Sequence, residues 1–188
     1  MKILVVGGGG RDHTILWKLA QSPRKPKLYC APGNGGISKI AQCVNIGATE
    51  IEKMVEFAKK EAIDLVVVAP DDPLAMGMVD ALEAAGIRAF GPNRAAAIIE
   101  ASKAFSKELM KKYGIPTADY ATFSDAEEAL RYVQTAEIPL VVKASGLALG
   151  KGVLICKTRQ QAEDAVRQIM VDKAFGAAGE TVVIEEFL

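Results

Sequence analysis

The sequence is poor in the residues that bind metal ions and form disulfides. Its 188 residues include one histidine, His13, and three cysteines, Cys30, Cys43 and Cys156. The cysteines are odd in number and show neither a Cys-x-x-Cys pair nor a Cys/His spacing, which excludes a metal site of that type. Because Cys30 and Cys156 fall inside predicted strands, we expect both to be buried structural thiols.

Net charge and long hydrophobic runs are also lacking. Lys+Arg and Asp+Glu number 23 each, so the formal net charge is zero. This balance gives no electrostatic footprint for nucleic acid or an anionic membrane. No apolar run approaches the ~18 residues of a membrane span, and the first one ends in glycines. Half of the residues are hydrophobic and 24% are charged, so we expect a soluble, cytoplasmic globular protein.

Short apolar runs alternate with helical patterns over the first ~100 residues, which is typical of an α/β fold with a parallel sheet. The run DLVVVAP has the continuous apolar character of an interior parallel strand. A helix from Thr49 is expected to start with a capping box between Thr49 and Glu52. The pattern predicts strands at 2–7, 26–31, 64–70 and 87–92, and helices at 14–20, 49–62 and 74–85.

The rhythm changes after one long helix predicted from Arg94 to Tyr113 and closed by Gly114. Two strands joined by a glycine-rich loop follow, which indicates an antiparallel pair rather than a βαβ crossover. We place a domain boundary near residue 100. The predicted elements are a helix capped by Ser124 and Glu127, strands at 139–145 and 152–158, a helix capped by Thr158 and Gln161, and a strand at 181–188.

The segment GGGGRDH follows the first predicted strand and precedes a helix, a position where backbone N–H groups bind anions. A dinucleotide fingerprint would need a third glycine where this chain has Asp12 or His13. It would also need an acidic residue at the end of the second strand, which reads Cys30-Ala31-Pro32. A nicotinamide cofactor is therefore disfavoured. A substrate phosphate or another polar group is expected here, with a tight turn that binds nothing as the alternative.

Other polar residues are expected near the same edge of the sheet. The segment PGNGG follows the second strand, and Asp71 and Asp72 follow DLVVVAP at the carboxyl edge where α/β sheets bind ligands. One of these aspartates has the alternative role of capping the next helix. His13 lies at the mouth of the first glycine segment and is at most a substrate-loop residue.

A second glycine segment, GLALGKG, connects the two antiparallel strands. It is not a Walker A loop, because Gly150-Lys151 is followed by Gly152 and a strand. Its glycines allow close approach to phosphate oxygens and Lys151 adds a charge, so the hairpin could close over a triphosphate. A flexible hairpin with a solvated lysine is the alternative. Lys143 favours the phosphate site, because a lysine in the apolar run PLVVKAS needs a charge partner.

These segments together resemble the glycinamide ribonucleotide synthetase (phosphoribosylamine–glycine ligase) family of purine biosynthesis. The resemblance covers essentially the whole chain. It implies an α/β fold, with a pre-ATP-grasp, Rossmann-like parallel sheet at 1–100 followed at 101–188 by the start of an ATP-grasp domain with its small antiparallel lid subdomain. The matching segments are VVGGGGRDH, APGNGG, PDDPLAMGMVDAL, GIRAFGP, ASKAFSKELMKKYGIPTADY, VVKASGLALGKGV and FGAAGETVVIEEFL.

The resemblance implies that ATP phosphorylates glycine and that 5-phosphoribosylamine then attacks the glycyl phosphate, giving glycinamide ribonucleotide, ADP and phosphate. Activation replaces a poor leaving group by a good one. Positioning and charge neutralisation by lysines and Mg²⁺ (or Mn²⁺) would supply the catalysis. The implied partners are ATP, glycine and 5-phosphoribosylamine, with no nucleic acid or membrane, and a monomeric full-length protein.

Site residues follow from the resemblance. Lys103 and Lys143 would contact the α- and β-phosphates, the segment 146–152 would cover them, and 185–188 would line the adenine. The implied ATP-binding residues are Lys103, Lys143, Gly146, Gly150, Lys151, Gly152, Glu185, Glu186, Phe187 and Leu188. The implied substrate-binding residues are Gly9, Gly10, Arg11, Asp12, His13, Asn34 and Asp71. Catalytic residues and metal ligands would lie after Leu188, so no metal ligand is expected within this chain.

The chain departs from the family pattern at several positions. Asp12 and Asp71 stand where glutamate is common, and Ser145 and Leu149 replace an acidic residue and an alanine in the second glycine segment. Family members are also more than twice as long. We therefore expect this chain alone to be catalytically inactive, and its exposed core to promote aggregation or dimerisation.

Two other functions remain open from the sequence. Another ATP-grasp ligase, such as a carboxylase subunit, would share the nucleotide site and differ at GGGGRDH, PGNGG and PDDPL. A non-catalytic nucleotide-binding module would bind ATP without turnover under any substrate.

Overall fold

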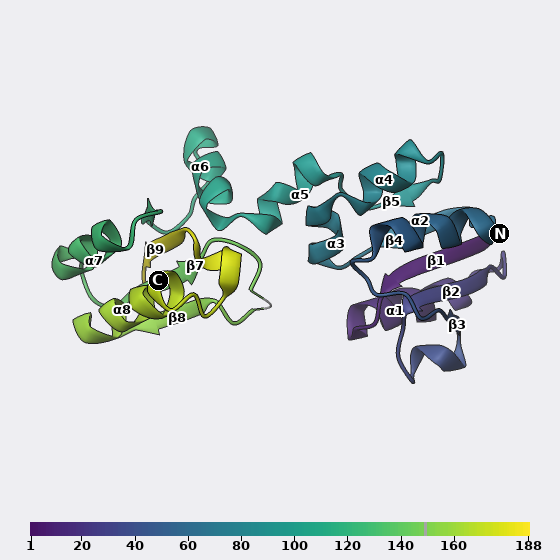
Figure 1. Ribbon diagram of the computed structural model, residues 1–188, viewed down its shortest axis with the longest axis horizontal. Coiled ribbons are helices and arrows are strands. Elements are labelled where there is room, and N and C mark those ends of the chain that lie inside the picture. Colours follow the sequence, from purple (N-terminus) through teal and green to yellow (C-terminus); the bar gives the residue numbers. More distant parts are fainter. Residues whose placement is uncertain (149) are drawn as a thin grey trace. The chain divides into compact units, whose positions relative to one another are not determined.

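The computed structural model describes residues 1–148 and 150–188; Leu149, which the sequence analysis singles out, lies outside the described residues. The chain divides into two compact units, Met1–Ala97 and Ile98–Leu188 (Figure 1). Each unit has its own sheet and its own hydrophobic core. In the described part of the chain, no helix is long and apolar enough to cross a membrane.

The first unit contains a five-stranded parallel sheet with the order β3-β2-β1-β4-β5. Strand β1 is central, and its alternate side chains enter two separate cores: Leu4 and Val6 on one face, Ile3 and Val5 on the other. The parallel α/β fold is therefore confirmed. The strands are β1 (Lys2–Gly7), β2 (Lys27–Pro32), β3 (Gln42–Cys43), β4 (Leu65–Val68) and β5 (Ala89–Phe90).

Helices cover both faces of this sheet. Leu16 of α1 packs in the core with Ile3 and Val5, whereas Met54 of α2 and Leu82 of α4 pack in the opposite core. The amphipathic patterns in the sequence thus place their apolar sides as expected. The helices are α1 (Gly10–Ala20), α2 (Ile51–Lys60), α3 (Asp71–Met76), α4 (Met78–Ala84) and α5 (Arg94–Ala101), the last of which continues into the second unit.

Two predictions in the first unit are wrong. The helix predicted at 74–85 is interrupted at Gly77, whose φ of 91° is left-handed and separates α3 from α4. The Thr49/Glu52 capping box does not form, because α2 begins at Ile51 with Glu50 as its N-cap. Instead, Oε2 of Glu50 accepts a hydrogen bond of 2.7 Å from the Gly47 amide. The predicted C-terminal glycine, Gly86, is left-handed as expected, with φ 75°.

The second unit contains an antiparallel sheet with the order β6-β9-β7-β8. One face packs on α7 and α8 through Val142, Ala144, Val182 and Ile184. By alternation, the other face carries Lys143 and Glu185. The elements are α6 (Lys103–Tyr113), β6 (Tyr120–Phe123), α7 (Ala126–Thr135), β7 (Leu140–Ala144), β8 (Val153–Cys156), α8 (Arg159–Val166), a π-helical segment (Arg167–Val171) and β9 (Val182–Glu186).

The predicted β7–β8 antiparallel pair is confirmed, but the helix predicted from Arg94 to Tyr113 is two helices. Ser102 is extended, with φ −140°, and its Oγ accepts a 3.2 Å hydrogen bond from the Phe105 amide at the start of α6. Helix α7 is capped by Asp125 rather than Ser124. The cap that Thr158 provides to α8 is confirmed.

Cys30 and Cys156 are buried and Cys43 is exposed, which confirms the expected burial of the two strand cysteines. Burial raises the pKa of the Cys30 thiol to about 12 and also raises the pKa of Cys156. Both thiols therefore stay protonated and unreactive well above neutral pH. We expect an alkylating maleimide at pH 7.5 to modify the native chain once, at Cys43, and the urea-unfolded chain at all three cysteines. Intact-mass spectrometry gives the count, and rapid native labelling of Cys30 would contradict the expectation.

Candidate functional site

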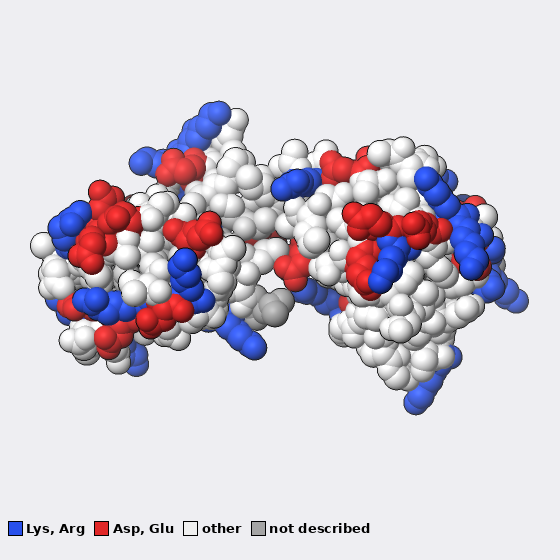
Figure 2. All heavy atoms as spheres, viewed as in Figure 1, with Lys and Arg blue, Asp and Glu red and all other residues white. Residues whose placement is uncertain are grey.

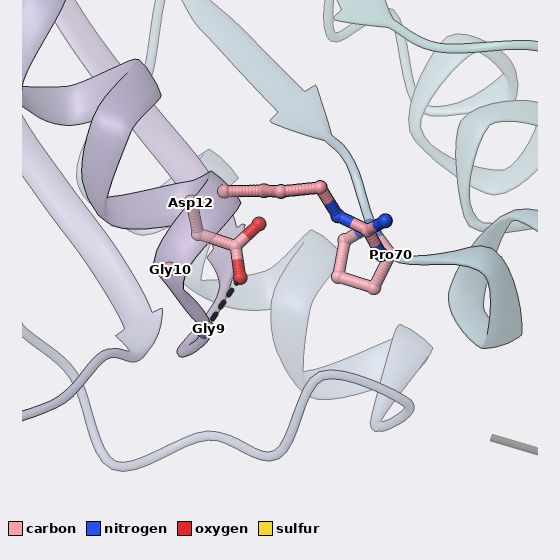
Figure 3. A pocket seen from close by; sticks show the side chains of 5 residues that line it. Gly9, Gly10, Asp12 and Pro70 are labelled. Carbon is pink, nitrogen blue, oxygen red and sulfur yellow. Dashed lines mark hydrogen bonds between the residues drawn. The ribbon is translucent and has the colours of Figure 1, made fainter. Parts of the chain in front are cut away.

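The turn between β1 and α1 is held by Asp12. Oδ2 of Asp12 accepts a 2.8 Å hydrogen bond from the Gly9 amide, and the side chain is buried (Figure 3). Gly7 has a φ of 127°, and a Cβ at this position would lie 2.2 Å from Oδ2 of Asp12. The glycine at position 7 is therefore required both by its backbone conformation and by the carboxylate beside it. Asp12 has a structural role that the sequence analysis did not foresee.

A pocket of about 410 Å³ lies at this turn and is lined by Gly9, Gly10, Arg11, Asp12 and Pro70 (Figure 3). It combines the N-terminus of α1, which begins at Gly10, with the basic side chain of Arg11. A helix N-terminus carries unpaired amide groups and a partial positive charge, so it favours an anion. The predicted first-loop residues are thus brought together, although Gly10–His13 form the first turn of the helix rather than a loop.

Asn34 fastens the segment after β2 to the same turn. Its Nδ2 donates a 2.8 Å hydrogen bond to the Gly8 carbonyl, and its Oδ1 accepts from the amides of Gly36 and Ile37 at 2.8 and 2.9 Å. Both ends of the side-chain amide therefore hold the backbone in place. The predicted proximity of this asparagine to the first glycine turn is present in the structure.

His13 and Asp71 do not line this pocket. His13 lines a smaller pocket of about 180 Å³ with Thr14 and Trp17. Asp71 is the first residue of α3, directly after Pro70, and neither it nor Asp72 caps the helix, because Pro70 is the N-cap. The proposed capping role of an aspartate is therefore wrong.

The second unit places a network of three charged residues on the face of its sheet opposite α7 and α8. Oε2 of Glu185 lies 2.6 Å from Nζ of Lys143 and 3.2 Å from Nζ of Lys107. The side chains of Glu185 and Lys107 are 7% and 9% exposed, and that of Lys143 is 25% exposed. The partner that Lys143 needs in its apolar strand is thus a carboxylate, and Lys143 keeps access to solvent.

Lys103 is positioned by the end of β7. Its amide donates to the Ser145 carbonyl at 2.8 Å, and its Nζ donates to the Gly146 carbonyl at 3.0 Å. Partial burial lowers the pKa of Lys103, the charge of Lys143 lowers it further, and two carboxylates oppose the shift. Lys103 and Lys143 are thus close enough for their charges to interact, an arrangement that favours an anionic ligand.

Ser145 connects the first turn of α6 to the end of β7. Its Oγ accepts a 3.2 Å hydrogen bond from the Ala104 amide in the first turn of α6. The serine that replaces the acidic residue of the family pattern therefore docks the start of α6 on β7. This contact supports the position of Lys103.

Glycine is required in the second glycine segment for two different structural reasons. A Cβ at Gly146 would lie 2.7 Å from Cα of Ala178, and a Cβ at Gly152 would lie 2.8 Å from Cβ of Ala148. Gly150 is left-handed, with φ 74°. Close packing accounts for the first two glycines and a turn for the third, and the Lys151 side chain is exposed beside them. A phosphate-contacting role for these residues stays a prediction.

The residues from Glu185 onward differ in burial. Glu185 is buried, Oε1 of Glu186 accepts a 2.9 Å hydrogen bond from the Asp119 amide, and Phe187 and Leu188 are exposed. A pocket of about 350 Å³ lies where β9 ends and β7 begins. It is lined by Asp119, Tyr132, Ala136, Glu137, Ile138, Pro139, Leu140, Ile184, Glu185, Glu186 and Phe187.

Lys107 is the residue of this network that the sequence analysis missed. A lysine on a helix is usually solvated, so the residue type did not predict that Lys107 is buried. Its spacing of four from Lys103 was the available signal, because residues four apart lie on the same helix face.

Within the described ranges, no group of three or more His, Cys, Asp or Glu residues could hold a metal ion. Figure 2 shows basic and acidic side chains interspersed on the visible face, in agreement with the zero net charge.

Comparisons with known proteins match both units of the chain. The family model of the phosphoribosylglycinamide synthetase N domain matches residues 1–100, and that of the ATP-grasp (A) domain of the same synthetase matches residues 101–188. Phosphoribosylamine–glycine ligases of Vibrio cholerae and Clostridium acetobutylicum are 50% and 47% identical over the whole chain, which covers 44% and 45% of their lengths. The chain thus spans less than half of these relatives.

Solved structures are similar in fold. A phosphoribosylamine–glycine ligase from Thermotoga maritima has a TM-score of 0.81 and 28% identity over the whole chain, which covers 44% of that structure. The biotin carboxylase domain of a Hydrogenobacter thermophilus 2-oxoglutarate carboxylase, solved with MgADP, has a TM-score of 0.76 and 23% identity, again over the whole chain and 44% of that structure. At that identity, the second likeness is a likeness of fold.

Proposed function

Because this chain belongs to the phosphoribosylglycinamide synthetase family, we propose that it carries the ATP-gripping and phosphoribosylamine-binding parts of a phosphoribosylamine–glycine ligase. The observation that carries the proposal is a pair of lysines: Nζ of Lys103 donates to the Gly146 carbonyl, and the charge of Lys143 is close enough to lower the pKa of Lys103. In this proposal, residues 1–100 form the substrate-side domain and residues 101–188 form part of an ATP-grasp domain.

ATP would be held by the second unit. Lys143 retains solvent access and carries a positive charge toward the α- and β-phosphates, and Lys103 adds a second charge from the start of α6. Gly150, Lys151 and Gly152 would cover the phosphates, and the segment from Glu185 to Leu188 would line the adenine. Fixed cations of this kind stabilise charge that moves during phosphoryl transfer without reorganising.

The phosphoribosylamine would bind at the first unit. Its phosphate is an anion suited to the N-terminus of α1 and to Arg11, and the pocket there is large enough for a phosphate and part of a sugar. Asn34 would act by holding the turn, as its hydrogen bonds to Gly8, Gly36 and Ile37 support. His13 and Asp71 stay proposed substrate contacts outside the lining of that pocket.

The proposed reaction forms glycyl phosphate and ADP from glycine and ATP, and the amine of phosphoribosylamine then displaces phosphate. A divalent cation, Mg²⁺ or Mn²⁺, would neutralise the phosphates. The described residues offer no carboxylate cluster that fits such an ion, so no step of this chain's chemistry is assigned to it. As part of the same proposal, the full-length enzyme acts as a monomer in the cytoplasm.

Substrate-dependent ADP release tests the proposal. The protein is mixed with Mg·ATP and with glycine, freshly generated phosphoribosylamine, both together, or bicarbonate in place of glycine. Release that requires glycine and phosphoribosylamine together supports the proposed ligase. Because the chain spans less than half of its relatives, we expect the chain alone to bind ATP without releasing ADP. Release that follows bicarbonate would instead indicate a carboxylase-type ligase. ATP binding without release under every condition, in a chain extended to the length of these relatives as well, would indicate a non-catalytic nucleotide-binding module.

A further inference from the structure

The ammonium group of Lys107 is buried and fully engaged. In addition to Glu185, its Nζ has acceptors in Oγ1 of Thr117 at 2.7 Å and the Ala118 carbonyl at 3.1 Å. The ring of Tyr120 lies beside it, with its centroid 5.4 Å from Nζ. An ammonium has three protons to donate, and three acceptors surround this one. Two of these acceptors take hydrogen bonds and the third forms an ion pair, so Lys107 is a buried cation held by the protein itself.

Lys143 differs from Lys107 in access, although both contact the same carboxylate oxygen of Glu185. Its side chain is 25% exposed, against 9% for Lys107. The three groups together carry a net charge of about +1 when all are ionised. Without Lys107, the carboxylate 2.6 Å from Lys143 would cancel the charge of that lysine, and an approaching anion would meet a neutral pair.

We propose that Lys107 is a positioning residue for the nucleotide: it holds and neutralises Glu185, so that Lys143 presents an uncancelled positive charge to the triphosphate. This inference rests on the proposed ATP site. It assigns a task to a buried lysine that does not itself touch the ligand. The task is electrostatic, so its loss weakens binding of the charged phosphates more than binding of the uncharged base and sugar, although Glu185 also begins the segment proposed to line the adenine.

Binding of ATP and of adenosine by the 188-residue chain separates this role from a general loss of structure. We expect Lys107→Met to weaken ATP binding by about 10–30-fold, because a buried carboxylate is left without its second cation near the phosphates. Adenosine carries no charge, so its affinity should change by less than about 2-fold. Lys111→Met makes the same substitution on an exposed position of α6 and should leave both affinities unchanged.

A double-mutant cycle with Glu185→Gln completes the test. Once the carboxylate is gone, Lys143 is no longer drawn to Glu185, and Lys107 can no longer release it from that contact. Adding Lys107→Met to Glu185→Gln should therefore cost less than about 3-fold in ATP affinity. An equal loss for ATP and adenosine, or an undiminished loss in the Glu185→Gln background, would overturn the inference and leave Lys107 a packing residue.

Two outcomes need separate interpretation. Lys107→Met on its own is dropped if circular dichroism shows that it does not fold. The double variant, Lys107→Met with Glu185→Gln, is then compared with Glu185→Gln alone, and a loss of ATP affinity above about 10-fold contradicts the inference. If the unsubstituted chain binds adenosine and ATP equally weakly, the ATP site itself fails. Normal ATP binding that is insensitive to Lys107→Met removes this inference alone.

Discussion

Replacing Lys143 by methionine lowers the affinity of the chain for ATP by about 100–1,000-fold, because a phosphate loses its partly buried cation. Methionine keeps a flexible apolar stem in β7 while removing the charge. Glu185 retains Lys107 as a partner after this change, so no buried carboxylate is left unpaired. The unfolding free energy should therefore change by less than about 1 kcal/mol. Calorimetric titration gives the affinity and urea unfolding gives the stability.

The matched control for this variant is Lys157→Met. Lys157 is an exposed lysine just after β8, and its substitution should change the ATP affinity by less than about 2-fold, since exposed charges are screened by water and salt. A Lys143→Met variant that binds ATP within about 5-fold of the unsubstituted chain would mean that the triphosphate lies elsewhere.

Gly7→Ala is expected to destabilise the first unit by about 3–4 kcal/mol. An alanine with left-handed backbone costs about 1–2 kcal/mol. Displacing the Asp12 carboxylate, which a Cβ would approach to 2.2 Å, sacrifices its hydrogen bond to Gly9 and adds about 1–2 kcal/mol. The single tryptophan, Trp17, lies in α1 of this unit. Its fluorescence therefore reports urea unfolding of the first unit.

Gly10→Ala is the control for Gly7→Ala. A Cβ at Gly10 meets nothing within 4 Å, and alanine is the better helix former, so the unfolding free energy should stay equal or rise by up to about 1 kcal/mol. If the clash is the cause, combining Gly7→Ala with Asp12→Ala should destabilise less than the sum of the single variants. A loss below about 1 kcal/mol for Gly7→Ala would show that the turn relaxes without cost.

The strands could be predicted because a short run of apolar residues, or an alternation of apolar and polar residues, indicates which faces of a strand are buried. The apolar run around Val66 is buried on both faces of a parallel sheet, and the alternation at Val142, Lys143 and Ala144 gives one polar and one apolar face. The glycines between β7 and β8 correctly indicated an antiparallel connection.

The helix interruption at Ser102 could not be predicted, because a distant partner accompanies it. Residues on both sides of Ser102 favour a helix, yet the chain breaks there as the Lys103 amide turns to the Ser145 carbonyl. At Gly77 the apolar pattern continues on both sides of the break. Local periodicity records the buried face of a helix and carries little information about a tertiary hydrogen bond to its first turn.

The candidate site was predictable for its exposed cations and not for its buried charges. Lys143 could be identified because a lysine in an apolar strand needs a charge partner. This rule does not say which residue the partner is. That Glu185 is this partner depends on the register of β7 against β9. Lys107 depends on the fold of the segment at Thr117 and Ala118, which supplies two of its acceptors.

Strand β9 lies in the interior of its sheet, between β6 and β7, although it follows both in the chain. The first unit has all its strands by Phe90, so it can fold on the ribosome while the second is still being made. At about 5–20 residues per second, the roughly 90 residues from Ala97 to the end of β9 take about 5–18 s to synthesise. Until β9 is made, Lys107 and Lys143 lack their carboxylate partner Glu185. The edge of β7 that will pair with β9 is exposed during the same time. That interval is the period in which a chaperone would protect this unit most.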